Sequence, residues 1–108
     1  MAREVTQEAF AAAWADGALV VDVREVDEYA GRHVPGARSI PLHTVPARCG
    51  ELPVDRPVYV ICASGNRSKT AADWMTSRGI DAYSVTGGTG AWARGGRPVT
   101  TGSHEPAA

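Results

Sequence analysis

The chain has little of what would tie it to a membrane or to a polyanion. No apolar run approaches the roughly 20 residues that a bilayer-spanning helix needs, and residues Met1–Glu4 lead straight into polar sequence without the character of a signal peptide. The formal net charge is only -1, so no global field attracts nucleic acid or an anionic lipid surface. We therefore expect a cytoplasmic protein that binds neither nucleic acid nor membrane.

Cysteine is also scarce, because Cys49 and Cys62 are the only two among 108 residues. In a cytoplasmic domain, two cysteines are more often free thiols than a disulfide. No group of Cys and His residues has the spacing of a zinc site, and no metal is predicted. The length suits one domain, which we place at residues 1–100, and the polar residues 101–108 are expected to form a flexible tail.

Short apolar runs alternate with helical patterns along the chain. Strands are predicted over 18–23, 39–41, 58–62 and 82–85, with helices between Thr6 and Gly17, over 25–29, 45–52 and 68–78, and around Trp92. This alternation predicts an α/β domain with a mostly parallel sheet covered on both faces. Ligands of such sheets bind beyond the carboxyl ends of the strands, where Asp22–Arg24 and Cys62 are expected to meet.

The stretch from Val58 to Ser68 is the most informative part of the chain. A run rich in β-branched residues ends at Cys62, small and polar residues follow, and a helical pattern begins at Ser68. The N–H groups of such a loop, together with the helix dipole, can lower the pKa of a thiol and hold an anion above it. The candidate nucleophile is Cys62, and the candidate anion-binding residues are Ala63, Ser64, Gly65, Asn66, Arg67 and Ser68.

These residues also have structural interpretations. A free cysteine is often buried and inert, and Ser68 can cap the following helix as well as donate to the sulfur of Cys62. Gly65, Asn66 and Arg67 favour the functional interpretation. A core cysteine requires neither a tolerant backbone nor a guanidinium that grips an oxyanion in bidentate fashion.

Several residues outside the loop also have more than one interpretation. Asp22, at a strand end, could hold Arg67 or the loop amides, or could pair locally with Arg24, and the sequence leaves these choices open. His33 is interpreted as a packing residue that bonds to backbone. Cys49 is interpreted as a small, half-buried residue, with a resolving thiol as the alternative. The tryptophans are expected to pack in the core: Trp14, Trp74 and Trp92.

The loop from Cys62 to Ser68 resembles the active-site loop of rhodanese-like domains. Two further stretches resemble the family's signatures, and all three occur in the family's order. They are Asp22–Glu25 with Glu28-Tyr29 and His33–Ala37 on the amino-terminal side, and Val85–Gly88 with Trp92 on the carboxy-terminal side. The resemblance covers residues 4 to 99. It implies a rhodanese-like fold with a central, mostly parallel five-stranded sheet flanked by helices on both faces.

The resemblance also implies a function, in which the Cys62 thiolate takes a sulfane sulfur from thiosulfate or a related donor as a persulfide. A thiol or cyanide then removes that sulfur, and the acceptor could be a small thiol, a thioredoxin-like protein or a sulfur-carrier protein. Neither a cofactor nor a metal is implied. Asp22 and Arg24 would support the loop. The alternative is a non-enzymatic interaction or redox-sensing module with the same fold, and sensing predicts a Cys49–Cys62 disulfide under mild oxidation.

Details of the loop refine this expectation. Four residues separate Cys62 from Arg67, one fewer than in the phosphatases that share this fold, so the ring is of a size for sulfur chemistry. Ala63 stands where many thiosulfate enzymes have a second arginine or a lysine, and Arg32 stands where the family usually has glycine. The Ala63 departure argues against fast thiosulfate turnover and leaves the donor open, whereas Arg32, which Gly31 precedes, is expected only to shift a turn.

Overall fold

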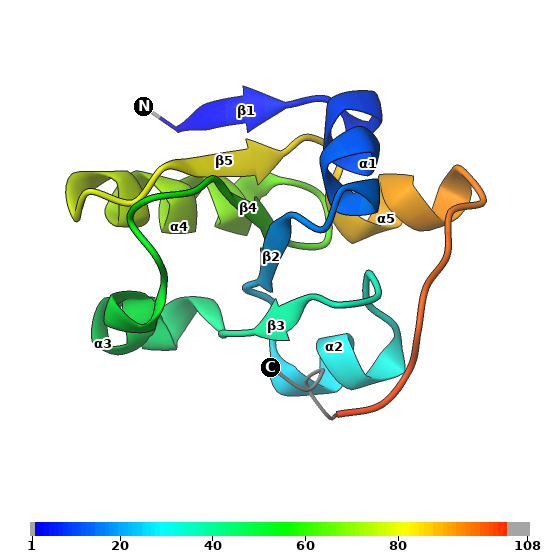
Figure 1. Ribbon diagram of the computed structural model, residues 1–108. Helices are drawn as coiled ribbons and strands as arrows, with labels where there is room; N and C mark the ends of the chain where they lie inside the picture. Colours follow the sequence, from blue (N-terminus) through cyan, green and yellow to red (C-terminus); the bar gives the residue numbers. More distant parts are fainter. Residues whose placement is uncertain (1, 104–108) are drawn as a thin grey trace.

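The computed structural model describes residues 2–103 and contains a parallel sheet with helices packed on its two faces (Figure 1). The five strands follow the order β1-β5-β4-β2-β3, and each neighbouring pair is parallel, so the predicted α/β architecture is confirmed. The strands are β1 (Arg3–Val5), β2 (Leu19–Asp22), β3 (Arg38–Ser39), β4 (Val58–Ile61) and β5 (Ala82–Val85). The helices are α1 (Gln7–Ala15), α2 (Val26–Gly31), α3 (Val45–Arg48), α4 (Asn66–Ser77) and α5 (Gly88–Arg94).

The central strands send side chains into two hydrophobic clusters, one on each face of the sheet. In β2, Val21 belongs to the cluster built with α3 and α4, whereas Val20 belongs to the cluster built with α1 and α5. In β4, Val60 and Ile61 divide in the same way. Burial on both faces explains why these strands appear in the sequence as nearly unbroken apolar runs.

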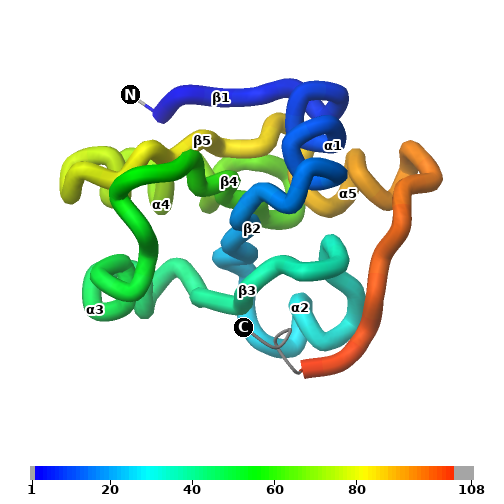
Figure 2. Tube along the Cα trace, viewed as in Figure 1, coloured from blue at the N-terminus to red at the C-terminus, as the bar shows by residue number. Residues whose placement is uncertain are grey.

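The edge strand β1 was not predicted. It pairs with β5, whose Tyr83 lies 80 residues after its partner Arg3 in the sequence, and the two strands run side by side in Figure 2. The guanidinium of Arg3 lies 4.2 Å from the centre of the Tyr83 ring and pairs with Asp81 at 2.6 Å. Arg3 and Glu4 are exposed, so this edge strand carries no apolar alternation that sequence reasoning could detect.

Helix α4 begins at Asn66, two residues before the predicted start. Gly65 has a φ of 114°, in the left-handed region that favours glycine, and it is the N-cap residue of α4. The prediction that Ser68 caps this helix is therefore wrong, because Ser68 lies inside the first turn. The helix thus brings Asn66, Arg67 and Ser68 directly after the short loop that follows β4.

The predicted helix over residues 45–52 is shorter than expected. Only Val45–Arg48 is α-helical, and it lies between 3-10 turns at Leu42–Thr44 and Cys49–Glu51. Pro46 occupies the first turn of α3 and lacks an N–H, while Gly50 has a low helix propensity. The pattern predicted a helical segment correctly, but not its division into three pieces.

The expectation for the three tryptophans holds for two of them. Trp92 is fully buried, and Trp14 packs against it edge to face with ring centres 5.3 Å apart. Trp74 is 37% exposed on the outer side of α4, where it lines a shallow apolar groove with Leu42, Val45 and Pro46. Its ring faces the guanidinium of Arg78 instead of the core.

The segment after α5 returns to α2. Thr100 and His33 exchange two backbone hydrogen bonds, and the N–H of Gly102 donates to Ala30. The predicted flexible tail falls largely on residues 104–108, which lie outside the described residues. None of the helices within residues 2–103 combines the length and the apolar character needed to cross a membrane.

Candidate active site at the carboxyl edge of the sheet

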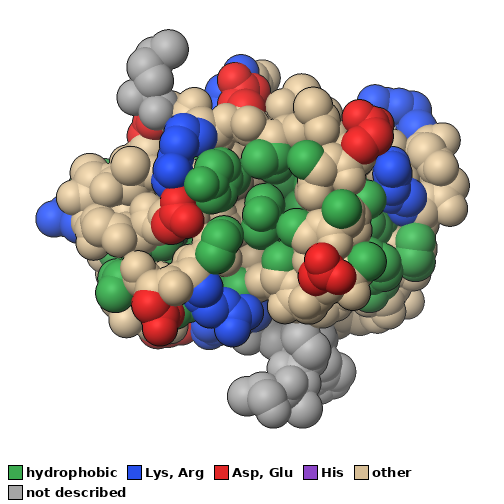
Figure 3. All heavy atoms as spheres, turned by 45° about the horizontal axis from the view of Figure 1, so that its top comes forward, with side chains coloured by type: hydrophobic (Ala, Val, Ile, Leu, Met, Phe, Trp, Pro, Cys, Tyr) green, Lys and Arg blue, Asp and Glu red, His purple; other side chains and the backbone are tan. Residues whose placement is uncertain are grey.

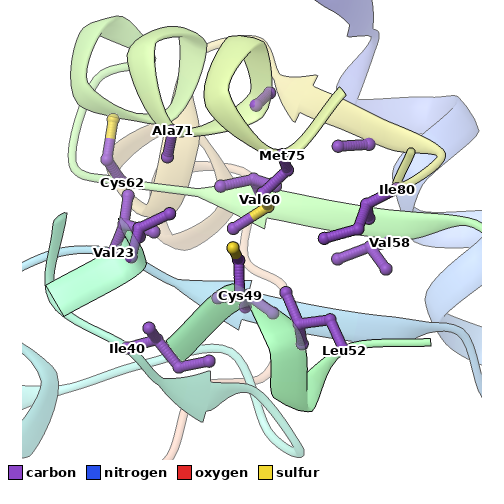
Figure 4. Packing of buried hydrophobic residues seen from close by; sticks show 14 residues of the cluster. Val23, Ile40, Cys49, Leu52, Val58, Val60, Cys62, Ala71, Met75 and Ile80 are labelled. Carbon is purple, nitrogen blue, oxygen red and sulfur yellow. The ribbon is translucent and has the colours of Figure 1, made fainter. Parts of the chain in front are cut away.

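The two polar stretches predicted to meet do lie at the same edge of the sheet. β2 ends at Asp22 and β4 ends at Ile61, and these two residues are paired in register. Cys62 follows β4 directly and is almost completely buried, with 1% of its surface exposed. Figure 4 shows its sulfur directed toward the first turn of α4. The parallel sheet therefore delivers the thiol to a helix N-terminus, as expected of an α/β site.

The sulfur of Cys62 is held by groups of the loop and of the first turn of α4. The N–H of Gly65 donates to Sγ at 3.0 Å, and the hydroxyl oxygen of Ser68 lies 3.4 Å from Sγ. Burial raises the pKa of the Cys62 thiol. The hydrogen bonds from Ser68 and from the backbone of Gly65 and Ser64 outweigh this effect, so the pKa is lowered below its ordinary value. The arrangement favours the thiolate, which is the nucleophilic form.

Behind Ser68 lies a second hydroxyl that the sequence analysis missed. Ser84, on β5, is completely buried, and its Oγ lies 2.7 Å from the Oγ of Ser68. When Ser84 donates to Ser68, the Ser68 proton is free to point toward either the carbonyl of Gly65 at 3.1 Å or the sulfur of Cys62. A serine within the otherwise apolar strand Ala82–Val85 was the available signal, because a buried hydroxyl requires a partner.

Replacing Ser68 by alanine is expected to move the reactivity of Cys62 to higher pH. The variant loses the side-chain hydrogen bond to the sulfur, which is the largest influence that lowers the pKa of Cys62. The measurement is the rate of iodoacetamide alkylation against pH. Ser77→Ala is the matched control, because the Ser77 hydroxyl donates to the carbonyl of Trp74 near the other end of α4, away from Cys62. An unshifted profile in Ser68→Ala would show that the backbone N–H groups alone set the pKa.

Arg67 is held by Glu28 of α2, and not by Asp22. The two terminal guanidinium nitrogens of Arg67, Nη1 and Nη2, donate to the two carboxylate oxygens of Glu28 at 2.7 and 2.9 Å. This hydrogen bonding lowers the pKa of Glu28 from 4.5 to about 2 and raises the pKa of Arg67. The sequence placed Glu28 in a family signature but gave it no role. The pairing of Glu28 with Arg67 could not be predicted from the sequence, because α2 and α4 come together only in the folded chain.

The Glu28–Arg67 pair predicts a specific loss of stability in acid. The folded-state pKa of Glu28 is depressed, so its contribution is complete above about pH 4.5 and is lost as the pH falls toward 2. Because both side chains are about one-third exposed, we expect only about 1 kcal/mol. Urea unfolding of the wild type and Glu28→Gln should differ at neutral pH and converge in acid. Asp55→Asn, in an exposed loop, should change little, and a difference that persists in acid would contradict the assignment.

Asp22 and Arg24 form a buried ion pair of their own. The carboxylate of Asp22 is fully buried and accepts from the side chain of Arg24 at 2.8 to 3.2 Å and from its backbone N–H at 3.0 Å. Arg24 also donates to the carbonyl of Arg32 at 2.6 Å. Of the alternatives left open by the sequence, the local pair is confirmed, and the proposed grip of Asp22 on Arg67 is wrong. The pair braces the edge of the sheet beside the loop.

The N-terminus of α5 holds the loop from the other side. The N–H groups of Thr89 and Gly90 donate to the carbonyls of Cys62 and Ala63 at 2.8 and 3.0 Å. The approach is so close that a Cβ on Gly88 would lie 2.3 Å from the Cys62 carbonyl oxygen. Gly87 and Gly88, the glycines of the carboxy-terminal signature, therefore begin a helix that packs directly on the loop backbone.

The remaining predicted residues lie as follows. Ser64 and Asn66 are exposed at the rim of the loop, and Ala63 is partly buried. His33 is a packing residue, as predicted, because it stacks on Tyr29 and its Nδ1 bonds to the carbonyl of Tyr29 at 2.7 Å. Across residues 2–103 no group of three or more His, Cys, Asp or Glu side chains gathers in a way that could hold a metal ion.

The surface charges are mixed. On the face that Figure 3 shows, acidic and basic side chains lie interspersed around a central hydrophobic area, with no separation by sign. Lys69, in the first turn of α4, is itself 3.7 Å from the carboxylate of Glu4. Arg67 and Lys69 are thus each paired with a carboxylate.

Comparison with known proteins finds similarity over most of the chain. The model of the rhodanese-like domain family matches residues 6–94. A protein of Allochromatium vinosum named sulfurtransferase is 36% identical over 102 residues, which cover 92% of this chain and 95% of that protein. Thiosulfate sulfurtransferase GlpE of Pseudomonas putida is 38% identical over 78 residues, 71% of each chain. A rhodanese-related protein from Thermoplasma volcanium matches in structure with a TM-score of 0.85 at 28% identity, over 91% of this chain and 97% of that one.

Proposed function

Because this chain belongs to the rhodanese-like domain family, we propose that it is a sulfurtransferase that carries a sulfane sulfur on Cys62. The observation that carries the proposal is the lowered pKa of the buried Cys62 thiol between the N–H of Gly65 and the hydroxyl of Ser68. Sulfur transfer needs a thiolate and a polar cradle for the departing anion, and it needs no general base. The relatives named sulfurtransferase support the same chemistry.

The proposed reaction has two steps. The Cys62 thiolate attacks the outer sulfur of a donor, the bond from that sulfur to the donor breaks, and the remainder leaves with the electron pair. The thiolate of an acceptor, or cyanide, then attacks the outer sulfur of the Cys62 persulfide, and Cys62 leaves as a thiolate. A thiol with a lowered pKa is the better leaving group in this second step. Small thiols, thioredoxin-like proteins and sulfur-carrier proteins are the proposed acceptors.

The test is the intact mass of the reduced protein after incubation with thiosulfate. We expect the wild type to gain the mass of one sulfur atom and to lose it again on addition of cyanide. The Cys62→Ser variant should gain nothing, whereas Cys49→Ser, the matched control for the other free cysteine, should behave like the wild type. A sulfur adduct that survives in Cys62→Ser, or none in the wild type with any sulfane donor, would overturn the proposal.

The redox-sensing alternative requires a disulfide between Cys49 and Cys62. Both cysteines are free, and the sulfur of Cys49 lies 3.9 Å from the carbonyl of Pro46. In Figure 4 the two cysteines come from different elements, and the sulfur of Cys62 points toward α4 and not toward Cys49. This geometry favours sulfur transfer. The cytoplasmic location expected from the sequence stays a prediction.

A further inference from the structure

We propose that Glu28 sets the class of sulfur donor: by occupying the guanidinium of Arg67, it makes Cys62 a better acceptor from an organic persulfide than from a dianionic donor such as thiosulfate. The inference rests on the proposed sulfur transfer and concerns its first step. It assigns a specificity-determining role to a residue of α2 that lies outside the loop.

The geometry of the pair supports this role. Both oxygens of the Glu28 carboxylate are bonded to guanidinium nitrogens of Arg67, at 2.7 and 2.9 Å. A bidentate contact of this kind uses the same fork of N–H groups that would grip the oxygens of a donor. The first turn of α2 fixes Glu28 in place, because its carboxylate also accepts the backbone N–H of Glu25 at 3.0 Å. A donor oxyanion must therefore displace a preorganised carboxylate.

The charges around the thiol also favour a donor that is not a dianion. The loop from Ala63 to Asn66 carries no charged side chain, and the charge of Arg67 is balanced by Glu28. With Cys62 as a thiolate, the three groups Cys62, Arg67 and Glu28 together carry one net negative charge, and the guanidinium of Arg94 near Gly90 is exposed to solvent. Lys69 adds little, because it is about half exposed and faces Glu4. A dianion that enters this site meets repulsion which a neutral or singly charged donor largely avoids.

The two kinds of donor differ in the charge of their leaving groups. With thiosulfate, the Cys62 thiolate bonds to the outer sulfur, the bond between the sulfurs breaks, and sulfite departs as a dianion, so the total charge of -3 is conserved. With an organic persulfide R–S–SH, the same attack gives Cys62–S–SH and the thiolate R–S⁻, which then takes a proton from water. Only the first reaction places two negative charges on the leaving group, beside the carboxylate of Glu28. The organic donor needs no free guanidinium.

The experiment compares the rate constants for loading Cys62 by thiosulfate and by 2-hydroxyethyl persulfide, a small organic donor that carries at most one negative charge. It uses the wild type, Glu28→Gln and the control Glu51→Gln, which removes a carboxylate held by Arg38 and Arg48. Glutamine keeps an oxygen for the N–H of Glu25. In Glu28→Gln we expect the thiosulfate rate to rise about tenfold and the persulfide rate to stay within about twofold. Glu51→Gln should leave the ratio of the two rates unchanged.

Wild-type protein provides a second measurement that is independent of any variant. If the site repels dianions, added neutral salt should screen the repulsion and speed loading by thiosulfate, while the persulfide rate stays nearly constant. If Arg67 were free of Glu28, the thiolate and the guanidinium would balance, and the thiosulfate rate would change little with salt. Thiosulfate loading that does not speed up with salt, or an unchanged ratio in folded Glu28→Gln, would overturn the role of Glu28 while leaving sulfur transfer intact. Failure of both donors to load Cys62 would instead refute the proposed function.

Discussion

Replacing Gly88 by alanine is expected to destabilise the protein by about 3 kcal/mol and to disturb Cys62 at the same time. The new Cβ would lie 2.3 Å from the carbonyl oxygen of Cys62 and 2.6 Å from that of Ala63. Both are backbone atoms, so neither can move aside as a flexible side chain would. Gly88 also has a φ of 59°, in the left-handed region. The loop or the start of α5 must therefore shift, which weakens the bond from the Thr89 N–H to Cys62.

Chemical denaturation and the alkylation rate of Cys62 measure the two parts of this prediction. Gly17→Ala is the matched control, since Gly17 has a φ of 86° but a Cβ added there would meet nothing within 4 Å. It should cost only about 1 kcal/mol, from the backbone conformation alone, and leave the alkylation rate unchanged. Equal losses in the two variants would mean that the close packing of α5 on the loop contributes nothing. A Gly88→Ala protein with wild-type Cys62 reactivity would mean that this packing does not position the thiol.

Much of the fold could be predicted because its central strands are simple in sequence. The strands β2, β4 and β5 are apolar apart from Asp22 and Ser84 and are largely buried on both faces, and β5 was predicted with the bounds it has, Ala82–Val85. A parallel strand that is buried on both faces needs apolar residues at nearly every position, and such a run can be recognised from the sequence alone. The edge strand β1 does not need apolar residues at every position. It was not predicted because only its pairing with β5 makes it a strand.

The candidate site was predictable only as far as it is local. Cys62 and its loop lie between a strand and a helix that are consecutive in the chain. The sequence pattern of this one stretch was therefore enough to predict them. Ser84 and Glu28 come from β5 and α2 and reach the loop only in the folded chain. The sequence left the partner of Asp22 open for the same reason, because the choice between Arg24 and Arg67 is made only in the folded chain. The start of α4 could not be predicted either. Its N-cap is Gly65, and this residue takes that place through a positive φ that the sequence does not reveal.

Replacing Asp22 by asparagine is expected to cost about 3 to 5 kcal/mol of stability. The side chains of Asp22 and Arg24 are 0% and 7% exposed, and their closest charged atoms are 2.8 Å apart. The substitution keeps the shape of Asp22 but leaves the guanidinium of Arg24 buried without a countercharge. Burial makes such an orphaned charge expensive, because the protein interior offers no water to solvate it. The loss should appear as a lower midpoint of urea unfolding.

Asp81→Asn is the control that separates burial from contact distance. The pair of Asp81 with Arg3 is shorter, at 2.6 Å, but its side chains are 38% and 47% exposed, so the loss should be at most about 1 kcal/mol. Adding Arg24→Met to Asp22→Asn should recover much of the stability, because the double variant no longer buries an unpaired charge. If Asp22→Asn cost no more than Asp81→Asn, the ion pair would not brace the edge of the sheet. If the double variant were no better than the single one, the carboxylate would act through the N–H of Arg24 instead of its guanidinium.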